Sequence, residues 1–167
     1  QKELAEIQTK EMGMLFWYSF WGIGGTIKLT RWFANNFESI LANEIQTAEW
    51  MQFESQYDPL GIIYGIAPWN FPFNQVLRAA IPNILAGNTT IYKHASNTPL
   101  AWQKIESLCR EAGCPEGIYQ NIFISNSESE YIISREEIKW VNITASEWAG
   151  RNIGSLAWKY LKPSVLE

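Results

Sequence analysis

Four polar groups in this sequence each lie at or just beyond the end of a short apolar run. They are Asn70, Lys93, the turn Thr144-Ala145-Ser146 and Glu167. If the apolar runs are parallel strands of one sheet, these groups lie at the carboxyl ends of the strands, where such sheets bind their ligands. An amide, a cation, a polar turn and a carboxylate at that edge favour a nucleotide or cofactor site. The alternative is that all four are capping and turn residues without a binding role.

The other reactive side chains form no comparable set. His94 is the only histidine, so neither a Ser-His-Asp triad nor a metal site can be assembled around it, and we assign it no catalytic role. Cys109 falls inside an expected helix and Cys114 in a Gly-Cys-Pro turn, where both are expected to fill space rather than act as nucleophiles. Two cysteines make no disulfide framework, which fits a reducing, cytoplasmic environment.

Composition narrows the class of partner. A chain of 167 residues supports one domain, or one domain with an appendage, and can bury a sizeable core. The net charge of -4 comes without a long basic run, which argues against nucleic acid or an anionic membrane as partner. No stretch reaches the roughly 18 to 20 apolar residues of a membrane span. A small-molecule ligand is therefore the expected partner.

After Leu60 the sequence alternates between short apolar runs and helical stretches. This alternation is typical of a parallel α/β sheet that is covered by helices on both faces. We therefore predict a Rossmann-like fold for residues 61–167. The expected strands are 61–67, 89–93, 119–125, 138–143 and 164–167, and the expected helices are 74–85, 99–112, 128–135 and 146–160.

The segment before this sheet has a different pattern. Apolar residues recur at three-and-four spacing up to about Asn43, which predicts helices, although Gly24-Gly25 weakens the middle. Residues 50–57 read as a strand that ends at Asp58-Pro59. That strand has too little sheet of its own, so we expect it to pair with another subunit of a homo-oligomer. The expected organisation is a helical segment (1–47), an oligomerisation strand with crossover (48–60) and the cofactor domain (61–167).

A set of short motifs also gives the sequence a family resemblance. They are Tyr57-Asp58-Pro59-Leu60-Gly61, Pro68-Trp69-Asn70-Phe71-Pro72, Gln75-Val76, Leu85-Ala86-Gly87-Asn88, Lys93-His94-Ala95, Thr98-Pro99-Leu100 and Glu111-Ala112-Gly113. In order and approximate spacing these motifs resemble those of aldehyde dehydrogenases, well from Tyr57 to Glu167 and poorly over the first fifty residues. Within that family, the sequence is most similar to succinate-semialdehyde dehydrogenases.

The resemblance implies a reaction and two catalytic residues. It implies NAD(P)-dependent oxidation of an aldehyde to the carboxylic acid, through a thioester on a cysteine that is not present in this chain. Asn70 would donate its side-chain amide to the oxyanion, an interaction worth roughly 3 to 4 kcal/mol, and Glu167 would activate the water that releases the acid. The chain as given would then be inactive alone. The alternative is a noncatalytic nucleotide-binding or scaffold module that ends near Glu167.

The resemblance also implies a cofactor site. Lys93 would contact the adenine-side ribose or its phosphate, and Ser96 stands where family members that favour NAD commonly carry a glutamate. A neutral hydroxyl does not repel a 2′-phosphate, so the sequence leans toward NADP over NAD. The turn that begins at Thr144 resembles the family's Gly-Ser-x-x-x-Gly, in which a helix N-terminus binds pyrophosphate. The remaining residues expected to bind cofactor are Ile66, Ala67, Pro68, Trp69, Ala145, Ser146, Ala149 and Gly150.

Tryptophans interrupt the resemblance. Six of them stand where family members usually carry small or polar residues, and residues 14–21 are almost wholly apolar. One interpretation is a hydrophobic contact surface. The other is that these residues are foreign to the natural sequence. The six positions are Trp17, Trp21, Trp50, Trp140, Trp148 and Trp158.

Overall fold

Five parallel strands form the centre of the structure, a computed structural model that describes residues 1–167. The order across the sheet is β5-β4-β3-β6-β7, so the chain starts in the middle, builds one side and then crosses to the other. The predicted Rossmann-like parallel sheet is thereby confirmed. The strands are β3 (Ile62–Ile66), β4 (Thr89–Lys93), β5 (Tyr119–Asn121), β6 (Ile138–Ile143) and β7 (Ser164–Leu166).

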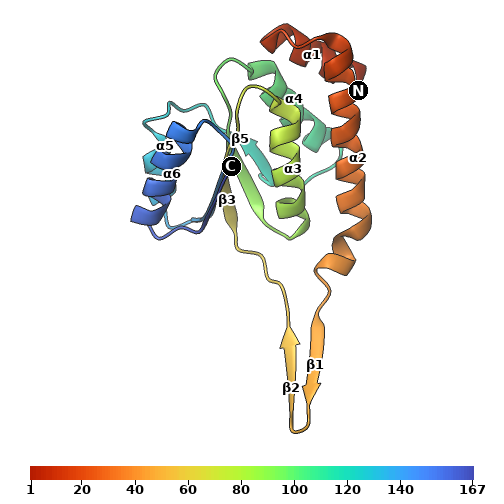
Figure 1. Ribbon diagram of the computed structural model, residues 1–167, viewed down its shortest axis with the longest axis vertical. Helices are drawn as coiled ribbons and strands as arrows, with labels where there is room; N and C mark the ends of the chain where they lie inside the picture. The colour runs from red at the N-terminus through yellow and green to blue at the C-terminus, as the bar shows by residue number, and fades with distance from the viewer.

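Helices cover both faces of this sheet (Figure 1). On one face α3 (Pro72–Leu85) and α4 (Pro99–Glu111) bury apolar side chains against β4 and β5. On the other face α5 (Ser129–Ser134) and α6 (Glu147–Lys159) pack on β3 and β6. Both α3 and α4 begin with a proline, whose fixed φ suits the first helical turn. Proline has no backbone N–H, but no helical hydrogen bond is lost, because N–H groups of the first turn have no acceptor within the helix. The four helices agree with the predicted ones to within two residues at each end.

Two further helices precede the sheet. The helical pattern of the first forty residues is divided at Gly13, which adopts a left-handed φ of 72° and ends α1 (Lys2–Met12). The long α2 (Phe16–Ile40) follows and packs against α3. It continues through Gly24-Gly25, although this pair was expected to weaken it. A Cβ atom at Gly24 would lie 2.9 Å from Nε2 of Gln1, so a glycine there lets the start of α1 approach α2.

A two-stranded antiparallel hairpin extends away from the rest of the molecule (Figure 1). It consists of β1 (Glu44–Ala48) and β2 (Met51–Ser55), and every residue of both strands is exposed. The sequence predicted β2 but missed β1, because the connecting Glu49-Trp50 lacks the Asn and Gly residues that mark a two-residue hairpin turn. The boundary expected between residues 47 and 48 falls inside β1.

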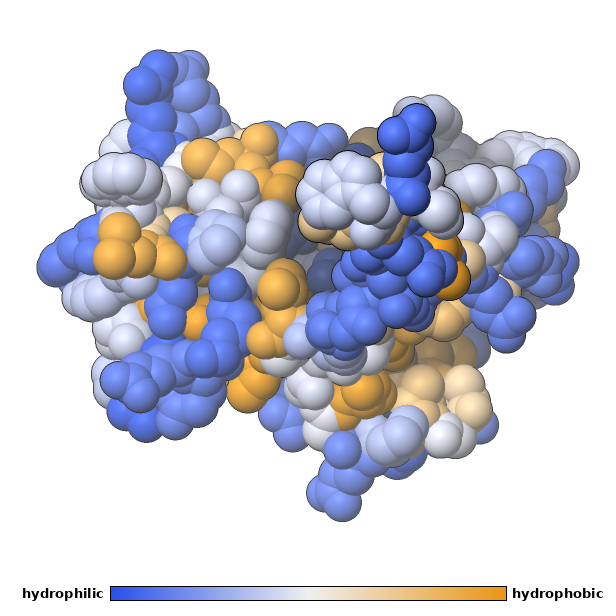
Figure 2. Space-filling view, turned by 90° about the horizontal axis from the view of Figure 1, so that it is seen from below, coloured by the Kyte–Doolittle hydropathy of each residue, from blue (hydrophilic) through white to orange (hydrophobic).

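Most of the unusual tryptophans lie on the surface. Trp17, Trp21, Trp50, Trp148 and Trp158 are exposed, and only Trp140 is partly buried. Viewed from the hairpin end, exposed hydrophobic side chains lie among hydrophilic ones (Figure 2). No helix in the structure combines the length and the apolar character needed to cross a bilayer.

Close packing across β3 gives a first testable prediction. The ring of the fully buried Tyr92 lies over Gly65, where a Cβ atom would be 2.2 Å from Cε1 of Tyr92. We expect Gly65→Ala to lower the free energy of unfolding by about 2 kcal/mol, because this packed site cannot expand without displacing the ring. Urea denaturation of the purified chain measures the change.

The control for this prediction is Gly150→Ala. Gly150 lies inside α6, and a Cβ atom there would meet nothing within 4 Å. Alanine is the better helix former, so the control is expected to gain up to about 1 kcal/mol. Equal stability of the two variants would show that the Tyr92 ring moves aside without cost.

Candidate functional site

A cavity of about 560 Å³ opens at the carboxyl edge of the parallel sheet. Its walls come from the segments that follow β3, β4, β5 and β6, so it lies where the strand order reverses between β3 and β6. Doubly wound sheets bind their ligands at this point of the topology. The residues that line it are Ile66, Ala67, Pro68, Trp69, Lys93, His94, Ala95, Ser96, Asn97, Trp102, Ile124, Ser125, Asn126, Ala145, Ser146 and Ala149.

The structure brings together nine of the ten residues predicted to bind cofactor. They line the cavity as three groups: residues 66–69 at the end of β3 and just beyond it, Lys93 at the end of β4 with Ser96 in the following loop, and Ala145, Ser146 and Ala149 at the start of α6. Gly150 is the exception. It lies one turn inside α6 and does not line the cavity.

Lys93 is the buried cation of this cavity. Its residue is only 8% exposed, and its Nζ atom has one hydrogen-bond acceptor, the backbone oxygen of His94 at 3.5 Å. No carboxylate pairs with it, and burial lowers the pKa of the lysine from its ordinary value. A buried charge without a counter-ion is costly, so the site is suited to a ligand that brings an anion.

The N-terminus of α6 forms the opposite wall. Ser146 is its N-cap residue and accepts a hydrogen bond from the backbone N–H of Ala149 at 3.4 Å. The positive end of the helix dipole and the remaining N–H groups of the first turn favour a phosphate at this position. Glu147 also lies in this turn, but its carboxylate is paired with Arg151 at 2.8 Å.

The two predicted catalytic residues lie outside the cavity lining. Asn70 is exposed in the bend after β3, and Glu167 is exposed after β7. Both follow carboxyl ends of parallel strands and so belong to the same edge of the sheet, with β6 between their strands. The structure joins Glu167 instead to Arg78 of α3, with which it forms an ion pair, and to Thr144, whose hydroxyl donates to it at 3.2 Å.

Some residues that line the cavity were not among those predicted from the sequence to bind cofactor. Ser125 and Asn126 follow β5, so the strand-end rule that selected Lys93 could also have selected them. His94 directly follows β4, so the same rule could have selected it. Trp102 had no such signal, because it reaches the cavity from α4, where its ring stacks on His94 with centroids 5.3 Å apart. Arg78 likewise gave no signal, since its partner Glu167 is distant in the sequence.

Neither cysteine belongs to the cavity. Cys109 and Cys114 are free thiols near the end of α4 and the start of β5. Burial raises the pKa of the Cys109 thiol to about 11, which disfavours the nucleophilic thiolate.

Comparison with known proteins agrees with this geometry. The chain matches the profile described as "Aldehyde dehydrogenase family" over residues 1–167. It is 36% identical to a probable NADP+ succinate-semialdehyde dehydrogenase of Synechocystis and 35% identical to an NADP+ succinate-semialdehyde dehydrogenase of Deinococcus radiodurans, over 99% of this chain in both cases. It covers 36% and 35% of those proteins, and so spans about a third of their length.

A solved structure shows the same similarity in three dimensions. The succinic semialdehyde dehydrogenase of Streptococcus pyogenes, in complex with NADP+, superimposes with a TM-score of 0.96 at 32% identity. The match covers 99% of this chain and 36% of that protein. On the sequence match over its full length and this shared fold, the chain belongs to the aldehyde dehydrogenase family.

Proposed function

We propose that this chain forms the nucleotide-binding part of an NADP-dependent aldehyde dehydrogenase that oxidises succinate semialdehyde. The observation that carries the proposal is Lys93, a buried lysine without a counter-ion that lines a cavity at the switch point of the sheet. The names of the similar proteins support NADP as the cofactor and succinate semialdehyde as the substrate. When bound, NADP+ supplies the hydride acceptor.

Two groups of the cavity would hold the nucleotide. Lys93 would neutralise a ribose phosphate. Ser96, exposed in the loop that follows Lys93, is neutral and would leave room for a 2′-phosphate without repelling its charge. The start of α6, with Ser146 as its cap, would bind pyrophosphate through backbone N–H groups. Ala145 stands where the family's motif has a glycine, so the pyrophosphate would meet a methyl group there. The segment from Ile66 to Trp69 supplies the wall after β3.

The catalytic roles of Asn70 and Glu167 remain proposals. The exposed amide of Asn70 would donate a hydrogen bond to the oxyanion formed from the aldehyde. Glu167 would take a proton from water only after it leaves Arg78 and Thr144, because a carboxylate held by a guanidinium is a weak base. The nucleophilic cysteine would lie outside these 167 residues, since Cys109 and Cys114 lie away from the cavity.

Titration of NADP+ and NAD+ into the purified chain tests the proposed function, and Ser96→Glu sharpens the test. A carboxylate at position 96 would repel a 2′-phosphate and accept hydrogen bonds from free ribose hydroxyls. We expect the variant to bind NADP+ about tenfold more weakly while its affinity for NAD+ is kept or improved. Isothermal titration calorimetry measures both dissociation constants.

The matched control is Ser107→Ala, which removes a hydroxyl of the same kind from α4, outside the cavity. Its affinities should equal those of the unchanged chain. Absence of binding of either nucleotide by the unchanged chain would reject the proposed function, and it would also count against a noncatalytic nucleotide-binding module.

The hairpin supports a proposal about assembly. An isolated two-stranded hairpin is marginally stable, and both edges and both faces of β1 and β2 are exposed. Pairing with the same element or another sheet in a second copy would satisfy its free backbone groups. We therefore propose a homo-oligomer in the cytoplasm, consistent with two free thiols, in which the hairpin of β1 and β2 is the oligomerisation element. In this proposal α1 and α2 form the helical segment before the hairpin, and residues 61–167 form the cofactor domain.

A further inference from the structure

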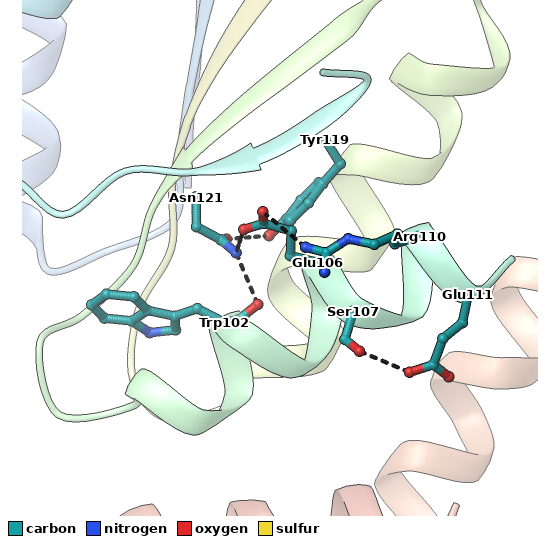
Figure 3. Close-up of polar contacts among 7 residues, drawn as sticks. All are labelled: Trp102, Glu106, Ser107, Arg110, Glu111, Tyr119 and Asn121. Carbon is teal, nitrogen blue, oxygen red and sulfur yellow. Dashed lines mark hydrogen bonds and ion pairs between the residues drawn. The ribbon is translucent and has the colours of Figure 1, made fainter. Parts of the chain in front are cut away.

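A chain of polar contacts connects the outer surface of α4 to the loop that carries Lys93. It begins at Arg110, whose guanidinium lies 3.7 Å from Oε1 of Glu106, and continues to the side chain of Asn121 at the end of β5 (Figure 3). Asn121 then contacts His94, the residue next to Lys93. Among the four residues that make these contacts, Arg110, Glu106, Asn121 and His94, only His94 lines the cavity.

The surroundings of Asn121 fix the orientation of its amide. Its Nδ2 atom lies 2.9 Å from the backbone oxygen of Trp102 and 2.9 Å from Oε2 of Glu106, and both oxygens can only accept (Figure 3). The amide nitrogen must therefore face them. This leaves Oδ1 of Asn121 as the acceptor for the hydroxyl of Tyr119 at 2.9 Å and for Nε2 of His94 at 2.9 Å.

The orientation of Asn121 determines the state of His94. Nε2 of His94 lies 2.9 Å from Oδ1 of Asn121, which can only accept, and 3.0 Å from the hydroxyl of Tyr119, whose own proton goes to Oδ1 of Asn121. Both contacts therefore assign the proton to Nε2 and leave Nδ1 as a bare acceptor. Nδ1 is buried and has no hydrogen-bond partner. The ring stacks on Trp102 at an interplanar angle of 22°, and burial lowers its pKa to about 4. The imidazole is therefore neutral, with a single tautomer, at physiological pH.

The backbone of His94 also contacts the cationic end of Lys93, at 3.5 Å. The backbone oxygen of His94 is the one acceptor that contacts Nζ of Lys93. The far end of the same loop is closed by Thr98, which accepts from Nε1 of Trp102 at 2.9 Å and donates to the oxygen of Ala95 at 3.1 Å. The loop with Lys93 and Ser96 is thus held at both ends by side chains of α4 and β5.

We propose that Asn121, oriented by Glu106, is a positioning residue of the nucleotide site: it holds His94 in one tautomer and thereby fixes the loop that presents Lys93 and Ser96 to a phosphorylated ribose. The inference rests on the proposed function, because it assigns Lys93 to that ligand. The affinity for a nucleotide that carries a phosphate on its ribose should therefore depend on Asn121. Asn121 does this without touching the ligand, since it does not line the cavity.

The test combines binding with the spectrum of the single histidine. Asn121→Asp keeps the shape of the side chain but replaces the donor that faces Glu106 and Trp102 by an oxygen. We expect NADP+ to bind about tenfold more weakly, since a buried hydrogen bond is replaced by two facing acceptors. Nitrogen-resolved NMR should show His94 protonating at a higher pH than in the unchanged chain, because a carboxylate then faces Nε2.

A second substitution should restore the site. In Asn121→Asp combined with Glu106→Gln, the amide of the new glutamine can donate to the new carboxylate, so donor and acceptor are exchanged between the two positions. We expect part of the NADP+ affinity to return, because one of the two facing acceptors becomes a donor while the backbone oxygen of Trp102 still faces the carboxylate. Ser107→Ala is the control on the same helix, because its hydroxyl contacts only Glu111 on the exposed side (Figure 3).

The outcomes separate this inference from the proposed function. If the unchanged chain binds NADP+ and Asn121→Asp binds it equally well, the inference alone is overturned. It is also overturned if His94 of the unchanged chain carries its proton on Nδ1, a result that needs no variant to fold, or if Ser107→Ala weakens binding as much as Asn121→Asp. If the unchanged chain binds neither nucleotide, the proposed function itself is rejected.

Discussion

Replacing Lys93 by methionine is expected to weaken NADP+ binding about a hundredfold and, at the same time, to stabilise the fold. The loss of affinity follows from removing a buried cation from a phosphate, since a hydrogen bond to a charged partner contributes about 3 kcal/mol at the upper end. The gain in stability follows from the 8% exposure of Lys93 and the absence of a paired carboxylate. Exchanging such a charge for an apolar side chain should add about 1 kcal/mol to the free energy of unfolding.

Calorimetric titration and urea denaturation of the same samples measure the two effects. Lys93→Arg is the control, since it keeps the charge but is bulkier and differently shaped, and it should retain more affinity than methionine without the gain in stability. A methionine variant that loses both affinity and stability would show that Lys93 is a structural residue. Unchanged affinity would remove Lys93 from the nucleotide site.

Lys93→Met is expected to lose affinity and gain stability because Lys93 favours binding of the nucleotide but lowers the stability of the free protein. Burial lowers the pKa of Lys93, which means that the charged form is less favourable in the folded protein than in water. A ligand phosphate would reverse that penalty. Residues that lower stability in the free protein and contribute to binding are the usual mark of a functional site.

Much of this arrangement could be read from the sequence because it depends on local patterns. The alternation of apolar runs with helical stretches specifies a parallel sheet, and Pro99 marks a helix start. The ends of the strands then locate the ligand edge and with it Lys93, whereas Ser96 is indicated by the family resemblance. The first strand of the hairpin was missed because its turn, Glu49-Trp50, carries no turn residue.

The rest of the site depends on contacts between segments far apart in the chain. Asn121 contacts His94 across 27 residues, and Glu167 pairs with Arg78 on another element. No local pattern encodes such pairs, so the contact between His94 and Asn121 could not be predicted from the sequence. Lys93, the neighbour of His94, is indicated both by its position at a strand end and by the family resemblance.

Acid should destabilise this fold in a window set by His94. The pKa of its imidazole is about 4 in the folded chain, mainly because of burial, and about 6.5 when the chain is unfolded. Between these values the unfolded state binds a proton that the folded state does not, so stability falls as the pH is lowered from about 6.5 to about 4. A difference of this size corresponds to about 3 kcal/mol in the free energy of unfolding.

The window distinguishes His94 from the carboxylates. Glu128, Glu130 and Glu137 have pKa values lowered by hydrogen bonds or by neighbouring cations, so their stabilising effect is lost only at pH values below those of ordinary glutamates. Urea denaturation at several pH values, with His94→Phe as a control that keeps an aromatic ring against Trp102, should show the slope in the unchanged chain and a much smaller slope in the variant. NMR titration of the single histidine provides an independent reading. Protonation near pH 6.5 in the folded chain would mean that His94 is solvated, and the fixed tautomer beside Lys93 would then lose its physical basis.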